Sequence, residues 1–407
     1  MPNPPWASLS LSRIPTGDSN HSEHRTATMR FALIGDHPDG LAMTAAMIGK
    51  GGHTLVAYAG PSGGRDQLRQ TGGDFRQFHD LEEILAEEEA ELVIVADAIE
   101  HRAAVLRRAL QADKHVLCVH PADLRPDICY EASMIVQDTR KVLLPLLAIG
   151  LAPGIAGLRD FLKQDSLGTV KAVEGEWNCN CGADWADSPV LSMWDGLRRL
   201  QGDIREVSVL TAGGEALTPA ESATLSGRFS SGPMIHVMVA PNAATTTCRW
   251  LVRGENGQAE LSMPDGPFGR AELRYPSPGG ERVESLAPWN PWQRLVEIVR
   301  DALDRKSPPL SWLDETRCLE LFDAARTSAR RRRVVPLDYE SSTEEANFKS
   351  TMTAVGCGLL LLLAVLFFAM PFTPGLKYVF LPLLVVFLLL QLFRWVVPAA
   401  NQEKTQP

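Results

Sequence analysis

The strongest constraint in the sequence is a pair of apolar runs near its C-terminus. Residues 351–370 carry no charged side chain, and residues 378–397 carry one, Arg394. As helices, these runs would each span about 30 Å, the hydrocarbon thickness of a bilayer. A pair of core helices in a soluble protein would show a polar stripe, and these runs show none. The sequence therefore predicts two transmembrane helices.

The short link between the runs, residues 371–377, predicts a hairpin whose outer ends lie on one side of the membrane. Positive charge gathers at those ends, because Lys349 precedes the first run and Arg394 and Lys404 flank the end of the second. The link itself carries Lys377. Since Lys and Arg favour the cytoplasmic side, we expect a two-span protein of the inner (cytoplasmic) membrane with its body in the cytoplasm.

Length and composition limit the rest of the chain. The 407 residues exceed one ordinary domain, and the net charge of −9 is spread without a broad basic face, which argues against a nucleic-acid partner. Seven cysteines without regular spacing argue against a disulfide framework and fit a reducing compartment. Residues 1–28 are polar and lack the apolar core of a signal peptide, so we expect a disordered leader.

Residues 29–150 alternate short apolar runs with helical stretches. Such runs are typical of parallel strands that helices cover on both faces. The pattern predicts the α/β class and a Rossmann-type, doubly wound parallel sheet, with its ligand at the carboxyl ends of the strands. The expected strands are 30–35, 54–58, 92–96 and 115–118, and the expected helices are 41–48 and 103–112.

The turn after the first strand is where this fold cradles a dinucleotide. In a G-x-G-x-x-G pattern the first and third glycines would be Gly35 and Gly40, and the middle position holds His37. The middle glycine normally lets the backbone approach the diphosphate. Asp36 and Asp39 add negative charge beside the phosphates. Gly35, His37 and Gly40 are therefore candidate cofactor-binding residues in a turn that leaves the binding of NAD or NADP open.

The end of the second expected strand also departs from the dinucleotide pattern. The acidic residue that would hold the ribose is missing, and the chain reads Ala59-Gly60 there. Arg65 follows in a Gly-rich stretch. It is either a contact for the 2′-phosphate of NADP or an ordinary solvated arginine.

An ordered set of stretches within residues 29–340 extends this interpretation. They are Phe31–Gly40, Asp80–Leu85, Glu91–Ala96, Ala109–Pro121, Ser166–Val170 and Trp312–Leu321. Together they resemble the glucose–fructose oxidoreductase/inositol dehydrogenase (Gfo/Idh/MocA) family. The resemblance implies an oxidoreductase of sugars, polyols or related hydroxyl compounds that uses NAD or NADP.

The resemblance also implies an α+β substrate domain over residues 151–340, with an open, mostly antiparallel sheet that often mediates homo-oligomers. Runs 225–229, 234–239, 245–252 and 259–263 are the expected strands, and Gly254-Glu255-Asn256-Gly257 is a turn between two of them. The remaining segments are a linker over 341–350, the transmembrane hairpin over 351–397 and a tail over 398–407.

The catalytic positions of the family are altered here. The family uses a lysine in an E-K-P triplet, helped by an aspartate and a histidine of the second domain. This chain reads Val119-His120-Pro121, which makes His120 the candidate catalytic residue and Pro121 a candidate cofactor contact. An imidazole can accept a proton near neutral pH. Counted back from Asp195, the aspartate and histidine positions hold Ser188 and Ser192.

Two hypotheses follow. The chain is a membrane-anchored, NAD(P)-dependent oxidoreductase of sugar or polyol derivatives in which His120 replaces the lysine. Alternatively, it is a catalytically inactive family member that acts as a membrane-bound nucleotide- or sugar-binding sensor or scaffold.

Three further features have simple explanations. Cys179 and Cys181 form a C-x-C pair, but a structural zinc needs four ligands and the sequence shows no second pair, so we expect no metal site. His236 lies in an apolar run, which predicts a core histidine. The run Arg330–Arg333 either stabilises the C-terminus of the last soluble helix or contacts anionic lipid headgroups.

Overall fold

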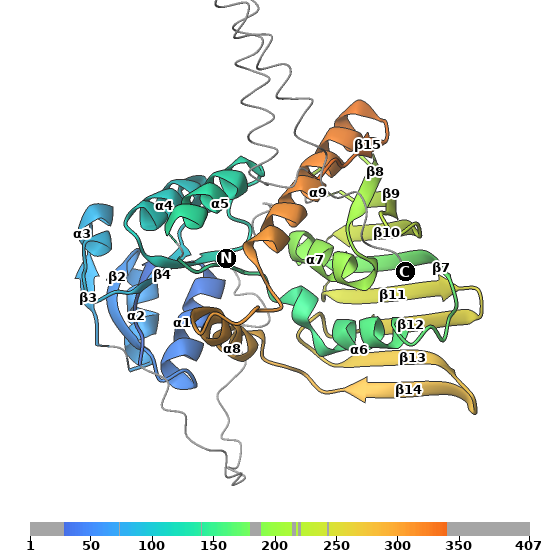
Figure 1. The fold of residues 1–407 in the computed structure, drawn as a ribbon, viewed down its shortest axis with the longest axis horizontal. Coiled ribbons are helices and arrows are strands. Elements are labelled where there is room, and N and C mark those ends of the chain that lie inside the picture. Colours follow the sequence, from blue (N-terminus) through green and yellow to red (C-terminus); the bar gives the residue numbers. More distant parts are fainter. Residues whose placement is uncertain are drawn as a thin grey trace, which may run out of the picture. The chain divides into compact units, whose positions relative to one another are not determined.

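A computed structural model describes residues 28–72, 74–139, 141–179, 189–213, 217–218, 221–241 and 244–339. These residues form two compact units. The first contains the described residues up to Ala122, together with Ile135–Ala148 and Asn290–Ser311. The second contains Asp123–Met134, Ile149–Trp289 and the described residues from Trp312 on. Figure 1 shows the elements of both units.

The first unit is built on a six-stranded sheet in which every strand pair is parallel. In spatial order its strands are β3 (Arg76–Phe78), β2 (Thr54–Ala59), β1 (Arg30–Gly35), β4 (Leu92–Ala96), β5 (His115–Val119) and β6 (Leu143–Leu146). The apolar runs of β1 and β4 are buried on both faces, as the lack of alternation predicts. The Rossmann-type sheet expected from the sequence is thus confirmed.

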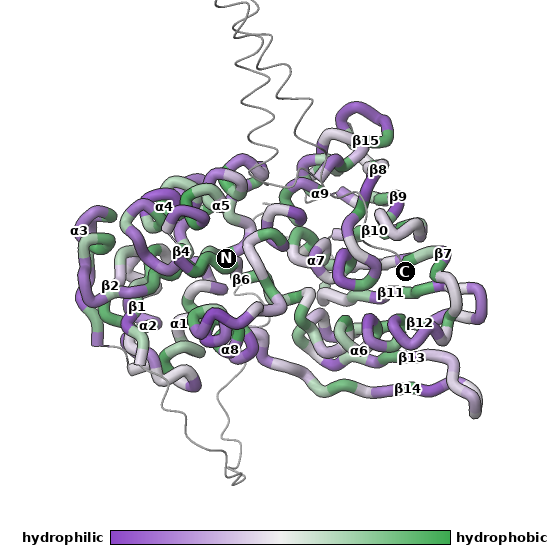
Figure 2. The backbone as a smooth tube through the Cα atoms, in the orientation of Figure 1, coloured by the Kyte–Doolittle hydropathy of each residue, from purple (hydrophilic) through white to green (hydrophobic). Residues whose placement is uncertain are grey.

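Helices cover both faces of this sheet. Figure 1 shows α4 (Ile99–Gln111) on one side and α1 (Pro38–Gly49) and α8 (Pro291–Leu303) on the other. In Figure 2 the tube of α8 carries both hydrophilic and hydrophobic residues, and its buried residues are all apolar. Lys50 Nζ, at the end of α1, donates to Gln293 Oε1 at 2.6 Å.

The sequence places α8 in the second domain, whereas the structure packs it in the first unit. The reason is tertiary, because the apolar face of α8 packs against α1, more than 240 residues earlier in the chain. Sequence order alone cannot show such a return of the chain.

Two glycines of the β1–α1 turn are required by close packing. Gly35 has a φ of +96°, and a Cβ there would lie 2.2 Å from the carbonyl oxygen of Ala96. A Cβ on Gly40 would lie 2.2 Å from the Cβ of Ala96. The start of α1 can therefore approach the end of β4 only because positions 35 and 40 carry no side chain.

The second unit contains a nine-stranded sheet. In spatial order its strands are β14 (Gly280–Leu286), β13 (Ala271–Ser277), β12 (Gly257–Met263), β11 (Thr247–Gly254), β7 (Val170–Cys179), β10 (Met234–Pro241), β9 (Ala223–Phe229), β8 (Ile204–Thr211) and β15 (Val335–Pro336). All pairs are antiparallel except β7 with β10. The predicted α+β domain and its turn at Gly254–Gly257 are both present.

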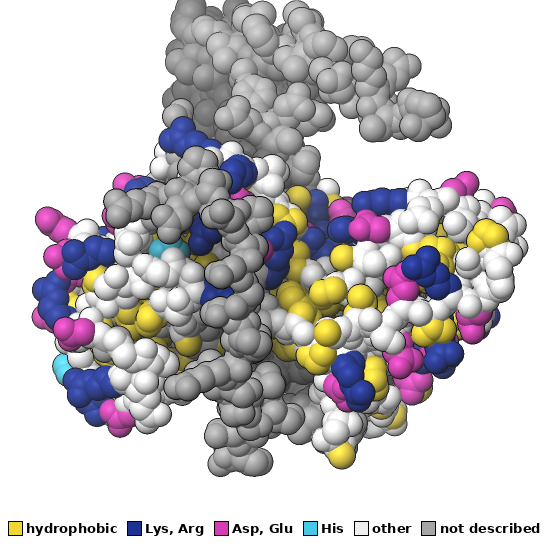
Figure 3. Space-filling view, turned by 90° about the horizontal axis from the view of Figure 1, so that it is seen from below, with side chains coloured by type: hydrophobic (Ala, Val, Ile, Leu, Met, Phe, Trp, Pro, Cys, Tyr) yellow, Lys and Arg dark blue, Asp and Glu magenta, His cyan; other side chains and the backbone are white. Residues whose placement is uncertain are grey.

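One face of this second sheet is covered by α6 (Pro153–Leu162), α7 (Pro189–Gln201) and α9 (Trp312–Arg331) (Figure 1). The opposite face carries cross-strand ion pairs, such as Arg253 with Glu174 at 2.7 Å and Arg249 with Glu260 at 2.8 Å. Figure 3 likewise shows acidic and basic side chains interspersed on the face that it presents. Acidic and basic side chains therefore alternate on the parts of the described surface seen here, without a broad basic patch there.

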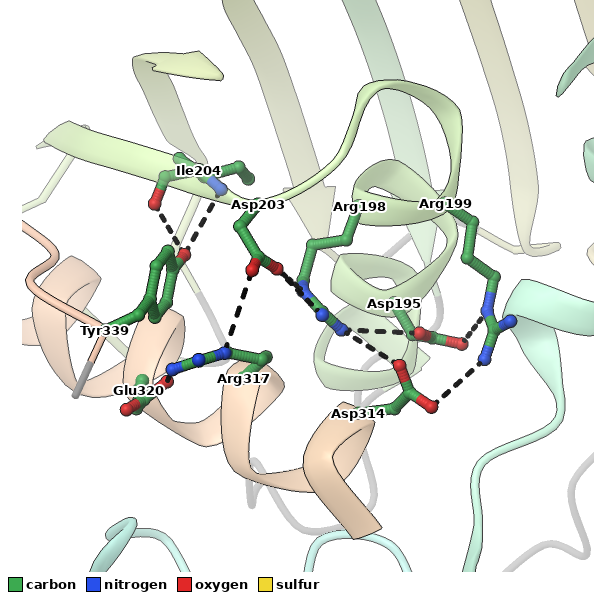
Figure 4. Close-up of polar contacts among 9 residues, drawn as sticks. All are labelled: Asp195, Arg198, Arg199, Asp203, Ile204, Asp314, Arg317, Glu320 and Tyr339. Carbon is green, nitrogen blue, oxygen red and sulfur yellow. Dashed lines mark hydrogen bonds and ion pairs between the residues drawn. The ribbon is translucent and has the colours of Figure 1, made fainter. Parts of the chain in front are cut away.

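A cluster of buried charges joins α7 to α9 (Figure 4). Asp195 is fully buried and accepts from Arg199 Nε at 2.7 Å, while Arg198 pairs with Asp203 at 2.8 Å. Both arginines also approach Asp314 of α9, at 3.5 and 3.6 Å. Such pairs stabilise a fold only when each charge has partners, which this cluster supplies.

The membrane predictions fall outside the described residues. The predicted linker, hairpin and tail, and residues 1–27 of the predicted leader, are not among them. Within the described ranges, no helix combines the length and apolar character needed to cross a membrane.

Candidate functional site

The candidate site lies at the carboxyl ends of β1, β2 and β4. The strand registers place Gly35 beside Ala96 and Ile34 beside Ala59, so the three strands end at the same level. From β1 the chain adds β2 and β3 on one side, and then β4, β5 and β6 on the other. This change of direction is the place where open α/β sheets bind ligands.

A cleft of about 370 Å³ opens at this position. It is lined by Ile34, Gly35, Ala59, Gly60, His79, Leu81, Asp97, His101, Ala104 and Val105. Its volume is near the lower end of the range of about 300–1,000 Å³ that is typical of ligand pockets. An apolar cavity in the second unit measures only about 20 Å³ and is too small for a ligand.

The cleft combines apolar walls with a fixed carboxylate. Leu81, Ala104 and Val105 supply apolar surface. Asp97, which directly follows β4, is half-buried, and its Oδ1 accepts from the Ala98 N–H at 2.8 Å. This bond holds the carboxylate at the rim, where it can accept hydrogen bonds from hydroxyl groups.

His37 occupies the middle position of the glycine turn and caps α1. Its side-chain Nδ1 accepts from the backbone N–H of Asp39 at 3.2 Å, and the backbone N–H of His37 donates to the Ala96 carbonyl at 2.9 Å. Burial, with the nearby positive charge of Arg102, lowers the pKa of His37 from 6.5 to about 3. The imidazole is therefore neutral at physiological pH and acts as an acceptor toward the helix.

Arg102 is a buried arginine in the first turn of α4. Its Nε donates to the carbonyl of Asp97 at 3.0 Å, and its Nη1 donates to the carbonyl of Pro121 at 2.6 Å. The guanidinium thus joins the loop after β4 to the loop after β5. Since it also lowers the pKa of His37, Arg102 acts on the three loops that follow β1, β4 and β5.

The candidate catalytic residue His120 directly follows β5. Its side chain is 5% exposed, and the bond to Pro121 is a cis peptide. Pro121 contributes its carbonyl to Arg102, which is a structural contact. The structure places Gly35, His37, Gly40, His120 and Pro121 at the same edge of one sheet, but only Gly35 of these five lines the cleft.

Other predicted contacts have partners within the protein. Arg65 Nε pairs with Asp66 at 3.0 Å, and its Nη1 donates to Gln77 Oε1 at 3.4 Å. Ser192 lies in α7, and Ser188 is outside the described residues. Asp195, from which the catalytic positions were counted, belongs to the buried charge cluster. The described part of α7 therefore serves packing and ion pairing.

The C-x-C pair does not present two thiols. Cys179 at the end of β7 is disulfide-bonded, while Cys181 lies outside the described residues. A disulfide removes the Cys179 thiolate as a metal ligand. Because disulfides persist in oxidising surroundings, this bond is at odds with the reducing compartment that the cysteine spacing suggests.

The prediction that His236 is a core histidine is wrong. It lies on the exposed side of β10, with its Nδ1 3.2 Å from Ser226 Oγ. The strand alternates, so Ile235 and Val237 point inward and His236 points outward. Arg330 and Arg331 are exposed in the last turn of α9, which fits stabilisation of that helix terminus.

Two residues of the site were missed in the sequence. Arg102 could have been found from helical spacing, because positions 102, 105, 106 and 109 form one buried stripe of α4. Asp97 directly follows the apolar strand β4, which is the usual place for ligand contacts in this fold. A buried arginine is not expected from residue type, because charged residues are seldom buried.

The site fits only part of a dinucleotide. The tight turn at Gly35 and the close approach at Gly40 match the fold's cofactor-binding geometry, and the cleft offers space beside them. The place of the diphosphate does not fit, because the His37 imidazole takes the Asp39 N–H and Pro38 has no N–H. A diphosphate would also meet the carboxylates of Asp36 and Asp39.

No protein-family model and no curated protein matches the chain. Solved structures do match. A levoglucosan dehydrogenase in complex with NADH and L-sorbose has a TM-score of 0.67 at 14% identity, covering 77% of this chain and 100% of its own. GenD2 from gentamicin A biosynthesis, in complex with NAD, has a TM-score of 0.65 at 18% identity, covering 79% and 100%.

An oxidoreductase from Agrobacterium radiobacter, in complex with NAD+, L-tartaric acid and magnesium, has a TM-score of 0.66 at 16% identity and covers 76% of this chain and 99% of its own. At such identities the likeness concerns the fold. The chain therefore shares its two-part fold with these oxidoreductases.

The low pKa of His37 predicts a loss of stability in acid. The His37 imidazole takes up a proton near pH 6.5 in the unfolded chain and only near pH 3 in the folded chain. Its contribution to the free energy of unfolding is therefore fully present above pH 6.5 and is lost as the pH falls toward 3. We expect His37→Asn, which keeps a favoured N-cap, to reduce this loss by roughly 1–3 kcal/mol in urea unfolding at pH 4.5 relative to pH 7.

The exposed histidine variant His79→Asn is the matched control and should follow the wild type. Equal losses in the wild type and in His37→Asn would contradict a buried, neutral His37.

Proposed function

We propose that this chain binds a nucleoside-containing ligand at the carboxyl edge of its six-stranded sheet, as a nucleotide- or sugar-binding protein. The observation that carries the proposal is the cleft of about 370 Å³ at the point where the strand order changes direction. The fold neighbours in complex with NAD or NADH support an adenine nucleotide as the class of ligand to test first.

The lining suits the two parts of a nucleoside. A flat base can lie against the apolar side chains of Leu81, Ala104 and Val105. The Asp97 carboxylate can accept hydrogen bonds from the ribose hydroxyls. It does so from the end of β4, since the end of β2 reads Ala59-Gly60 and has no acid to offer.

The test is calorimetric titration of the full-length chain with adenosine. We expect binding, and we expect Asp97→Asn to weaken it by about tenfold, because the ribose loses a hydrogen bond to a charged acceptor. Asp97→Asn keeps an oxygen for the Ala98 N–H, so the loop is preserved. The control is Asp74→Asn, an exposed carboxylate outside the cleft. No heat of binding at millimolar adenosine would refute the proposal.

A second candidate function is NAD(P)-dependent oxidation of a sugar or polyol. It is favoured by His120, a buried imidazole at the end of β5 in the position of the family's lysine. A bound nicotinamide would accept hydride, and a neutral imidazole can take the hydroxyl proton. This candidate stands second because the turn at His37 does not fit a diphosphate.

Turnover would decide between the two candidates. The full-length chain is incubated with NAD+ or NADP+ and a panel of sugars and polyols, and reduced nicotinamide is followed by absorbance. The enzyme function predicts turnover that His120→Ala lowers by about 100-fold or more, as for loss of a general base, while the exposed His236→Ala leaves it unchanged. Equal rates in wild type and His120→Ala would dismiss His120 as the base.

We also propose that residues 351–397 tether the body to the inner membrane, with the body on the cytoplasmic side. The two uncharged or nearly uncharged runs support the tether, and the flanking Lys and Arg residues support the orientation. The disulfide at Cys179 weighs against a cytoplasmic body, so sidedness is part of the test. A homo-oligomer through the second unit remains a prediction from the family resemblance.

Alkaline carbonate extraction tests the tether. We expect the full-length chain to stay with the membrane pellet and a chain ending at residue 340 to be released. Protease protection in inverted vesicles then reads the orientation, because a cytoplasmic body is digested without detergent. Release of the full-length chain would refute the tether, and protection of the body would refute the orientation.

A further inference from the structure

We infer that the ligand of the cleft carries no diphosphate at the β1–α1 turn, because His37 and Pro38 take the place of one. The ligand class is thereby narrowed to nucleosides and nucleoside monophosphates. The inference rests on the proposed function and uses the same site.

The backbone donors of the turn are already committed. A helix start binds phosphate through its unpaired N–H groups. Here the N–H of His37 donates to Ala96 at 2.9 Å, Pro38 has no N–H, and the N–H of Asp39 donates to His37 Nδ1 at 3.2 Å. These three features leave Gly40 as the one position from 37 to 40 whose backbone N–H they do not occupy or remove.

The charges of the turn also oppose a diphosphate. Burial keeps His37 neutral at physiological pH, with its pKa lowered to about 3, so its imidazole adds no positive charge. Asp36 and Asp39 flank it with carboxylates. Like charges a few ångströms apart repel one another, and the repulsion is stronger near a protein surface than in bulk water.

The buried cation beneath the turn does not compensate. Arg102 is 1% exposed, and its guanidinium donates to the carbonyls of Asp97 and Pro121. Arg102 is not among the residues that line the cleft, so an anion bound there would not contact its guanidinium without a rearrangement of the loops around it. Arg102 therefore organises the edge of the sheet and does not serve as a phosphate ligand.

The part of the cleft away from the turn keeps its binding capacity. Asp97 directly follows β4, Ala104 and Val105 lie on α4, and Leu81 begins α3 (Leu81–Leu85). None of these side chains depends on the donors of α1. A base and a ribose can use this part, whereas a diphosphate attached to the ribose would have to reach the blocked turn. The structure thus separates nucleoside binding from diphosphate binding.

The experiment compares adenosine, AMP, ADP and NADH by calorimetry on the full-length wild type and on the double variant His37→Gly/Pro38→Ala. The variant frees the Asp39 N–H and restores an N–H at position 38. In the wild type we expect ADP and NADH to bind no tighter than adenosine. In the variant we expect their affinities to rise by about tenfold or more, since one hydrogen bond to a charged group is worth roughly that factor.

Adenosine affinity should be equal in the two proteins, which shows that the cleft is intact. The matched control is Asn290→Gly, which removes the side-chain cap of α8 in the same unit and lies outside the cleft lining. It should change no affinity. The single variant His37→Gly changes the turn less, and its affinities for ADP and NADH provide a second measurement of the same effect.

The outcomes separate the two proposals. NADH or ADP binding to the wild type at least tenfold tighter than adenosine would overturn the inference and leave the proposed function standing. An unchanged affinity for ADP and NADH in both His37 variants would also overturn it. Failure of adenosine to bind the wild type would refute the proposed function, whereas a gain of ADP binding in the variants would still support the block at His37 and Pro38.

Discussion

The carboxyl edge of the parallel sheet depends on one guanidinium, that of Arg102. A buried charge is unfavourable unless its hydrogen bonds are satisfied, so the neighbouring loops must hold acceptors in fixed positions around it. Arg102 donates to the carbonyls of Asp97 and Pro121 and thereby joins the ends of β4 and β5. Burial, helped by this charge, keeps the imidazole of His37 from accepting a proton, so that its Nδ1 can cap α1.

Through these contacts, polar groups at the carboxyl edge of the sheet form their hydrogen bonds within the protein. In a dinucleotide-binding turn, the donors at the start of the first helix are left for the ligand. Here the protein supplies its own acceptor, His37, and removes another donor with Pro38. The glycines at positions 35 and 40 remain, because they are needed to pack α1 against β4 whether or not a ligand binds. A fold can therefore keep the glycines of a cofactor turn while the donors of that turn are used within the protein.

The second unit also depends on buried charges. Its helix α7 holds the buried Asp195 with Arg198 and Arg199. The cluster continues through Asp314 of α9, so the helices are joined by ion pairs. Removing one partner would leave an uncompensated buried charge, so the intact cluster is needed for the packing of α7 against α9.

The sequence alone determined several elements and their order. Apolar runs without alternation specified the parallel strands β1 and β4, because burial on both faces leaves a continuous apolar signal. The run of β10 was also predicted as a strand, although its apolar composition wrongly indicated a core position for His236. The same reading placed His37 in the middle of the glycine turn. Only the tertiary structure decided which N–H group His37 caps, which carbonyls Arg102 joins and that α8 returns to the first unit. Those outcomes depend on contacts between residues far apart in the chain, and no local pattern records such contacts.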